Sequence, residues 1–162
     1  MKDVELQQIK IDEKFMRAAL KEAQKAYVED EVPIGAVIVK DGKIISRGHN
    51  TREKDNLVIS HAEINALKKA SKKLKDWQLV NSAIYITVEP CPMCAAALYQ
   101  SHIERVVYGT TNLKEGAIES LMKLYKIEGL RFYPRTEGGI LKEECAAILK
   151  KYFKNKRIIK NK

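Results

Sequence analysis

Cysteine is scarce in this chain, which has only 3 among 162 residues. So few thiols cannot build the disulfide framework that stabilises small secreted domains, and unpaired thiols suit a reducing cytoplasm. Long apolar runs are missing too: no uninterrupted stretch could cross a bilayer, and the first eight residues lack the apolar segment of a signal peptide. We therefore expect a cytoplasmic protein without a membrane anchor.

Internal repeats and low-complexity linkers are also absent. The 162 residues have the size of one domain, and 45% of them are hydrophobic, as is ordinary for a globular protein. The sequence therefore predicts a single domain over residues 1–157. Residues 158–162 end a lysine-rich stretch, and we expect them to be a disordered basic tail.

Acidic residues are in the minority, because 30 lysines and arginines face 21 acids and give a net charge of +9. Residues 150–162 contain basic residues and no acid at all. Such a patch neutralises phosphates, and the interleaved Tyr152 and Phe153 have rings that can stack on the bases of a splayed RNA loop. We interpret this segment as an RNA contact; a solvated lysine-rich surface is the alternative.

Helical and strand patterns alternate along the chain. Asp41-Gly42 between two β-branched runs is a strong hairpin signal. The alternation predicts an α/β fold with a mixed central sheet of about five strands, part of it parallel, and helices on both faces. The expected helices are 14–28, one from His61, one from Cys91, 120–125 and 141–153, and the expected strands are 34–39, 44–47, 84–88, 103–108 and 130–133.

Three good zinc ligands and one spare carboxylate lie in two short motifs. His61 and Glu63 are two residues apart, and Cys91 and Cys94 are three apart where a helix should begin. The positive end of a helix favours the thiolate, which is the metal-binding form. A catalytic zinc has three protein ligands and keeps a position open for water. We therefore predict a hydrolytic zinc centre on His61, Cys91 and Cys94, with Glu63 handling the protons of the water.

Two other interpretations of this pattern exist. A closed structural zinc site would need a fourth ligand from His49, His102 or Cys145. His102 would lie about 12 Å along one helix from Cys94, too far to share a metal, but this argument does not remove the other two. Alternatively, the cysteines form a core turn and the histidine is unrelated.

The spacing His-x-Glu followed by Pro-Cys-x-x-Cys is the signature of zinc nucleobase deaminases. Further segments extend the match over roughly residues 12–157, and together they resemble the bacterial tRNA-specific adenosine deaminases of the cytidine deaminase-like superfamily. The segments that carry the resemblance are 31–37 (Glu-Val-Pro-Ile-Gly-Ala-Val), 48–50 (Gly-His-Asn), 61–64, 89–94 (Glu-Pro-Cys-Pro-Met-Cys), 103–109, 120–122 and 139–147.

The resemblance implies a three-layer α/β/α fold, a Zn²⁺ cofactor and a homodimer. It also implies deamination of adenosine to inosine at the wobble position of a tRNA anticodon, with the activated water attacking C6. By residue, it implies that Glu63 is the proton shuttle and that Asn50 contacts the base. It further places Asn112 near the sugar of the target nucleotide, and the aromatic pair Tyr152 and Phe153 against the anticodon loop.

Three places depart from the family pattern. Asn112 stands where relatives usually have an aspartate, which puts the strictness of RNA-over-DNA choice in doubt. Residues 117–119 (Ala-Ile-Glu) replace smaller residues in a loop, and Gly138-Gly139 has one extra glycine before the last helix. None of the three touches the zinc motif.

Two other functions remain open on the sequence. A small-molecule deaminase of guanine, cytosine or a nucleoside would share the zinc motif but would not need the basic tail. A non-enzymatic, zinc-stabilised RNA-binding module would not need Glu63. Deleting the tail and replacing that carboxylate therefore discriminate among the three.

Overall fold

Five strands form one mixed sheet at the centre of the computed structural model, which describes residues 1–162. The spatial order is β2-β1-β3-β4-β5. β1 runs antiparallel to both of its neighbours, whereas β3, β4 and β5 are parallel to one another. The strands are β1 (Gly35–Lys40), β2 (Lys43–His49), β3 (Ser82–Val88), β4 (Arg105–Thr110) and β5 (Arg135–Glu137).

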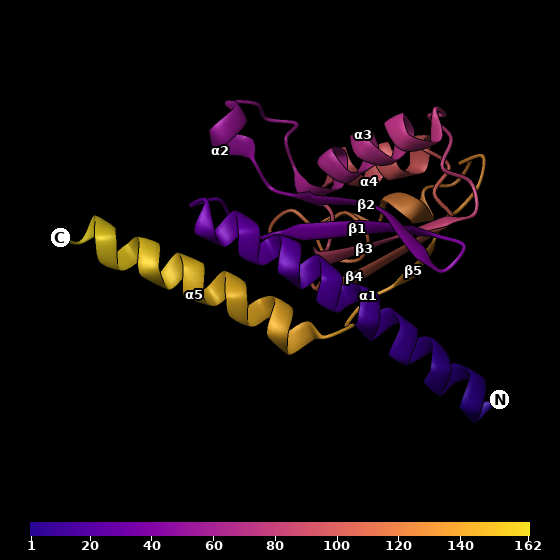
Figure 1. Ribbon diagram of the computed structural model, residues 1–162, viewed down its shortest axis with the longest axis horizontal. Coiled ribbons are helices and arrows are strands. Elements are labelled where there is room, and N and C mark those ends of the chain that lie inside the picture. The colour runs from indigo at the N-terminus through magenta and orange to yellow at the C-terminus, as the bar shows by residue number, and fades with distance from the viewer.

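Helices cover both faces of this sheet, as Figure 1 shows. The α1 helix (Lys2–Val28) and the α5 helix (Lys142–Lys160) lie on one face. The α3 helix (Ala62–Leu74) and the α4 helix (Pro92–Gln100) lie on the other. The three-layer α/β/α prediction is therefore confirmed, and no helix is long and apolar enough to span a bilayer.

Successive strand residues point to opposite faces, and this alternation builds two cores. Ile84 and Ile86 of β3 are buried with the alanines of α3 and α4. Tyr85, between them, is buried with Phe15 and Met16 of α1. Each face of the sheet thus has its own apolar cluster, which fixes the two helical layers against it.

Local patterns mispredicted three segments. The expected helix at 120–125 is only a 3₁₀ turn, η1 (Leu124–Lys126), because the N–H of Leu124 donates to the carbonyl of Ala117 and not to that of Ser120, four residues before it. The expected strand at 130–133 is replaced by β5, an exposed edge strand without apolar alternation. Residues 158–160 are helical instead of disordered, because α5 continues with good helix-forming residues to Lys160.

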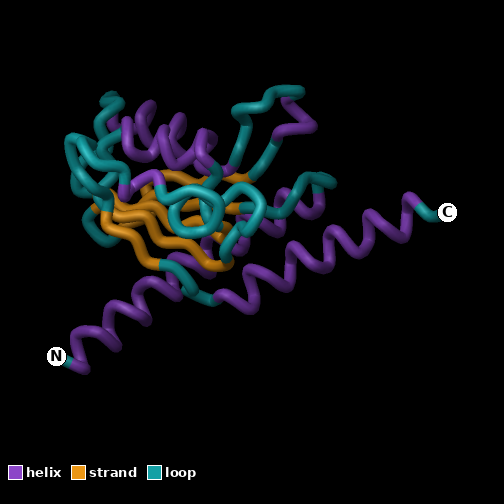
Figure 2. The backbone as a smooth tube through the Cα atoms, turned by 180° about the vertical axis from the view of Figure 1, so that it is seen from behind, coloured by secondary structure: helices purple, strands orange, loops and turns teal.

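Both long helices extend beyond the sheet. The α1 helix begins at Lys2, well before the expected residue 14, and its residues 2–11 are all exposed. Figure 2 shows its start and the end of α5 projecting from opposite sides of the molecule. These turns contribute nothing to either core, so periodic burial could not have signalled them.

Ligand sites in open α/β sheets collect outside the carboxyl ends of the strands. The carboxyl end of β3 leads through Glu89 and Pro90 into α4, and α3 begins on the same face. The predicted metal motif lies at this position.

Candidate metal centre and catalytic site

Two helix N-termini converge on the candidate site. His61 is the N-cap residue of α3, and Cys91 is the N-cap residue of α4, with Pro92 as the first helical residue. Proline suits this position because its fixed φ is already helical and its missing N–H would have had no partner. Both positive helix ends therefore face the same small volume and favour negative ligands there.

The three predicted ligands lie together. The Nδ1 atom of His61 is 3.6 Å from the Sγ of Cys91 and 3.4 Å from the Sγ of Cys94. All three ligand atoms lie within 4.8 Å of one another. A tetrahedral zinc, with bonds of about 2.0–2.3 Å, separates its ligands by about 3.6 Å. The distances and the donor set therefore fit zinc.

Charge in this pocket also favours a cation. Contact with Cys94 lowers the pKa of the Cys91 thiol to about 4. Contact with Cys91, together with burial, raises the pKa of the Cys94 thiol. A buried pocket resists two thiolates side by side unless a positive ion lies between them.

Glu63 lies in the first turn of α3 and is buried. Burial raises the pKa of its carboxyl group above the ordinary value. A raised pKa favours a carboxyl group that takes up and releases protons near neutral pH. Glu63 does not belong to the cluster of three ligand atoms, which leaves its carboxyl group available for proton transfer.

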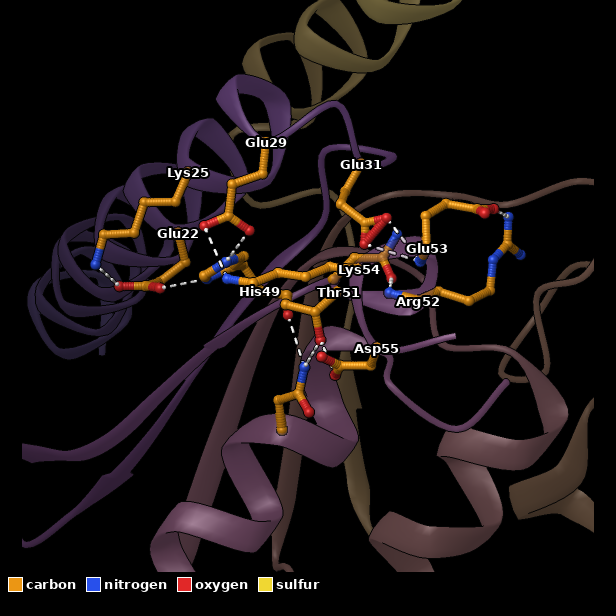
Figure 3. A network of polar contacts seen from close by, with 12 residues as sticks. Glu22, Lys25, Glu29, Glu31, His49, Thr51, Arg52, Glu53, Lys54 and Asp55 are labelled. Atoms are coloured by element: carbon orange, nitrogen blue, oxygen red, sulfur yellow. Dashed lines mark hydrogen bonds and ion pairs between the residues drawn. The ribbon is translucent and has the colours of Figure 1, made fainter. Parts of the chain in front are cut away.

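Neither of the two open alternatives for a fourth ligand lies in this cluster. Figure 3 shows His49 between Glu22 of α1 and Glu29, the residue after α1, at 3.4 Å from the first carboxylate and 3.1 Å from the second. Cys145 of α5 is buried in the apolar cluster on the α1 face of the sheet. The cluster is thus made of His61, Cys91 and Cys94 alone.

Asn50 is held by both ends of its amide next to this site. Its Nδ2 donates to the carbonyl of Val32 at 3.2 Å, and its Oδ1 accepts the backbone N–H of Arg52 at 3.1 Å. An amide nitrogen has two hydrogens, so one N–H stays free for a ligand. The predicted base contact is compatible with this arrangement and stays a prediction.

The other three residues predicted to contact the substrate, Asn112, Tyr152 and Phe153, differ in how much of their side chains is exposed or already bonded. The Oδ1 of Asn112 accepts the backbone N–H of Glu115 at 3.1 Å, so its side chain shapes a loop. Phe153 has 45% of its surface exposed and can receive a base. Tyr152 cannot: it is buried, packs edge-on against Tyr27 and donates its hydroxyl to the carbonyl of Asp30. Stacking by Tyr152 is therefore corrected to a structural role.

Glu89 was not predicted to be a functional residue, although it belongs to the motif at residues 89–94. It is buried at the end of β3 and accepts backbone N–H groups from residues 112–120. Burial alone would raise its pKa, but those hydrogen bonds lower it overall. Its partners are distant in the sequence, so the only local signal was a carboxylate directly after an apolar strand.

Comparison with known proteins identifies the family to which this chain belongs. The zinc-binding region of cytidine and deoxycytidylate deaminases matches residues 9–110. A tRNA-specific adenosine deaminase from Bacillus subtilis (strain 168) is 43% identical over 146 residues, which are 90% of this chain and 91% of that protein. The chain belongs to the tRNA-specific adenosine deaminase family.

Solved structures agree with this family. A structure from a study of A-to-I editing by tRNA:A34 deaminases at the wobble position superposes with a TM-score of 0.81 at 41% identity, covering 83% of this chain and 98% of that one. A guanine deaminase from Bacillus subtilis gives a TM-score of 0.58 at 32% identity, covering 71% and 84%. Zinc is the cofactor that this deaminase family and the His–Cys–Cys cluster support.

Proposed function

We propose that this chain deaminates adenosine to inosine at the wobble position of a tRNA anticodon. The observation that carries the proposal is the three-residue zinc cluster with a buried carboxylate beside it, in a chain of the tRNA-specific adenosine deaminase family. A zinc site with only three protein ligands is suited to hydrolysis, whereas four ligands would close it.

His61, Cys91 and Cys94 would hold the zinc. When bound, zinc activates water for attack on an electron-poor ring carbon. Glu63 would take a proton from that water, deliver it to the ring nitrogen and then assist the departure of ammonia. Its buried position beside the thiols keeps the carboxyl group protonatable, which these transfers require.

Asn50 would orient the base. Its amide is fixed by Val32 and Arg52, so the remaining N–H has a defined direction. A fixed donor selects a purine edge that offers an acceptor and loses little entropy on binding. Asn112 would lie near the sugar, as the family resemblance implies, although its side-chain oxygen is already occupied by the loop.

An anticodon loop is the substrate that fits these features. A wobble base is unpaired, so little free energy is needed to extract it. Phe153 offers an exposed ring for stacking, and the basic residues around it on α5 offer phosphate contacts. We further propose that residues 1–157 form one catalytic domain and that the protein acts as a homodimer in the cytoplasm.

The experiment that tests this function compares substrates. The zinc-loaded protein is incubated with an anticodon stem-loop carrying adenosine at the wobble position, and separately with free adenosine, guanine and cytidine. We expect inosine from the stem-loop and far slower turnover of each small molecule. Faster turnover of guanine or cytidine would instead assign the chain to small-molecule deamination.

A further inference from the structure

One buried carboxylate without a part in the proposed chemistry organises a long loop beside the metal centre. Glu89 follows the last residue of β3 and is 2% exposed. Its two oxygens accept five hydrogen bonds. The N–H of Asn112 (3.1 Å) and the hydroxyl of Ser120 (2.5 Å) donate to Oε1. Three further N–H groups donate to Oε2, those of Ile118 (3.0 Å), Glu119 (2.8 Å) and Ser120 (3.0 Å).

The loop over residues 112–120 depends on these bonds. It contains no helix or strand, so its backbone N–H groups have no ladder to join. Buried N–H groups without an acceptor are costly, and the Glu89 carboxylate supplies acceptors to four of them at once. A carboxylate has about four lone-pair sites, so the five hydrogen bonds occupy its accepting capacity in full.

Gly116 lets the loop close around the carboxylate. A Cβ atom there would lie 2.3 Å from the Cδ of Glu89 and 2.4 Å from its Oε1, distances that no real structure tolerates. Its backbone needs no unusual φ, so the requirement for glycine comes from the close approach of this carboxylate and of the Asn112 carbonyl oxygen, which would lie 2.5 Å from the Cβ. The loop and Glu89 are therefore fitted to each other from both sides.

The same loop lies against the metal centre. The N–H of Ala117 donates to the carbonyl of Pro90 at 2.8 Å, one residue before Cys91. Ala117 and Ile118 are buried in the cluster that contains Ala62, next to His61, and Ala95, next to Cys94. Loop 112–120 thus stands directly beside the residues that would hold zinc.

We propose that Glu89 is a positioning residue that fixes loop 112–120 as one wall of the nucleotide site. It touches neither zinc nor substrate and acts through the loop, above all by holding the backbone of Asn112. One side chain thereby sets the distance between the zinc-binding turn and the wall that meets the target nucleotide. This inference rests on the proposed function, since the wall is assigned to a nucleotide.

Two variants disturb this contact from opposite sides. In Glu89→Gln, an amide NH₂ replaces one oxygen, and the favourable orientation keeps the three bonds to Oε2 while losing the one to Asn112. In Gly116→Ala, the carboxylate stays but the new methyl group pushes the loop away from it. Because both variants disturb the contact between Glu89 and the loop, their effects should be less than additive in the double variant.

Three measurements on the zinc-loaded variants test the proposal. We expect one zinc per chain to be retained and amide hydrogen exchange in residues 112–120 to quicken by at least about tenfold, since a charge-assisted hydrogen bond is lost. KM for the anticodon stem-loop should rise by about tenfold while kcat stays within about threefold, because the lost positioning acts on binding.

The control is Glu128→Gln, which alters an exposed carboxylate outside loop 112–120 and should change neither exchange in the loop nor KM. Loss of zinc in Glu89→Gln would overturn the proposal and assign Glu89 to the metal turn. Unchanged exchange, or faster exchange with unchanged KM, would also overturn it. If the unaltered protein does not turn over the stem-loop, the proposed function fails, while exchange still reports whether Glu89 holds the loop.

Discussion

At the scale of single residues, Glu63 carries the most direct prediction. We expect Glu63→Gln to keep the fold and one zinc per chain but to lose at least about a hundredfold in kcat, the usual contribution of a general acid–base group. Stem-loop turnover and elemental analysis of the same sample measure this, with Glu128→Gln in an exposed loop as the control. Loss of zinc on the Glu63 change would make that carboxylate a ligand instead.

The zinc cluster could be predicted from sequence because its ligands occupy two short motifs. Each motif fixes its own geometry: His61 caps one helix, and Cys91 and Cys94 begin another. Glu89 and Tyr152 were different, because their environments come from residues far along the chain. Tyr152 looked like a stacking ring beside lysines, yet its hydroxyl bonds to Asp30, 122 positions away.

The buried carboxylate of Asp12 makes the free energy of unfolding depend on pH in the acidic range. This carboxylate accepts two bonds from Arg105, at 2.7 and 2.8 Å, and one from the hydroxyl of Tyr85 at 2.8 Å. Burial alone would raise its pKa, but these bonds hold it below the ordinary 3.8. A carboxylate with a depressed folded pKa stabilises the fold above its unfolded pKa, and this contribution is lost as pH falls through the folded value.

We therefore expect the free energy of unfolding to decrease from about pH 4 downward, and Asp12→Asn to lack this part of the decrease. At neutral pH the same change should cost about 3 kcal/mol, because it leaves the Arg105 guanidinium without its partner. Urea unfolding at a series of pH values measures both. Parallel pH curves for the two proteins would contradict the assignment.

At the scale of elements, periodicity predicted the segments that bury one face. Helix α3 and strand β3 appeared where the apolar pattern placed them, because their patterns follow packing on the sheet. The segment 120–125 failed for a tertiary reason: the chain before it turns around the Glu89 carboxylate, and the N–H of Leu124 donates to Ala117 instead of to Ser120. No local pattern could contain that information.

The α5 helix separates two roles in neighbouring aromatics. Tyr152 is buried against Tyr27, whereas Phe153 is 45% exposed. We expect Tyr152→Ala to lower the free energy of unfolding by about 3 kcal/mol, as large-to-small core changes do. Phe153→Ala should leave stability unchanged and weaken stem-loop binding by about 1–3 kcal/mol, the range for one lost stacking contact.

Thermal unfolding and a stem-loop binding titration on both variants measure this separation. Phe153→Ala is the informative member of the pair, because its ring contributes little to the core. Normal RNA affinity in that variant would remove α5 from the RNA contact. Reduced affinity in Tyr152→Ala alone would show only that α5 must be anchored.

At the scale of the whole molecule, residues 150–162 concentrate positive charge without a single acidic residue among them. The net charge is +9, and only two lysines outside α5 form ion pairs, Lys25 with Glu22 and Lys54 with Glu29. In α5, Lys156 pairs with Asp30, whereas Lys150, Lys154 and Arg157 form no ion pair. Free cations near an exposed aromatic ring are the arrangement expected for a phosphate backbone with splayed bases.

This arrangement predicts how salt affects RNA binding. Each phosphate contact adds about 0.7 to the slope of log affinity against log salt for single strands, so replacing Lys150, Lys154 and Arg157 with Gln should lower that slope by about 2.

The matched control replaces Lys10, Lys40 and Lys43. Lys40 and Lys43 flank the hairpin turn between β1 and β2. Lys10 lies near Asp12, whose carboxylate bonds to Arg105, the first residue of β4. All three lysines therefore lie at the end of the sheet away from the zinc cluster. Binding titrations at several salt concentrations measure both triple variants. Because both lose three charges, equal slopes would mean that net charge alone attracts RNA, whereas a lower slope in the α5 variant alone assigns the phosphate contacts to that helix.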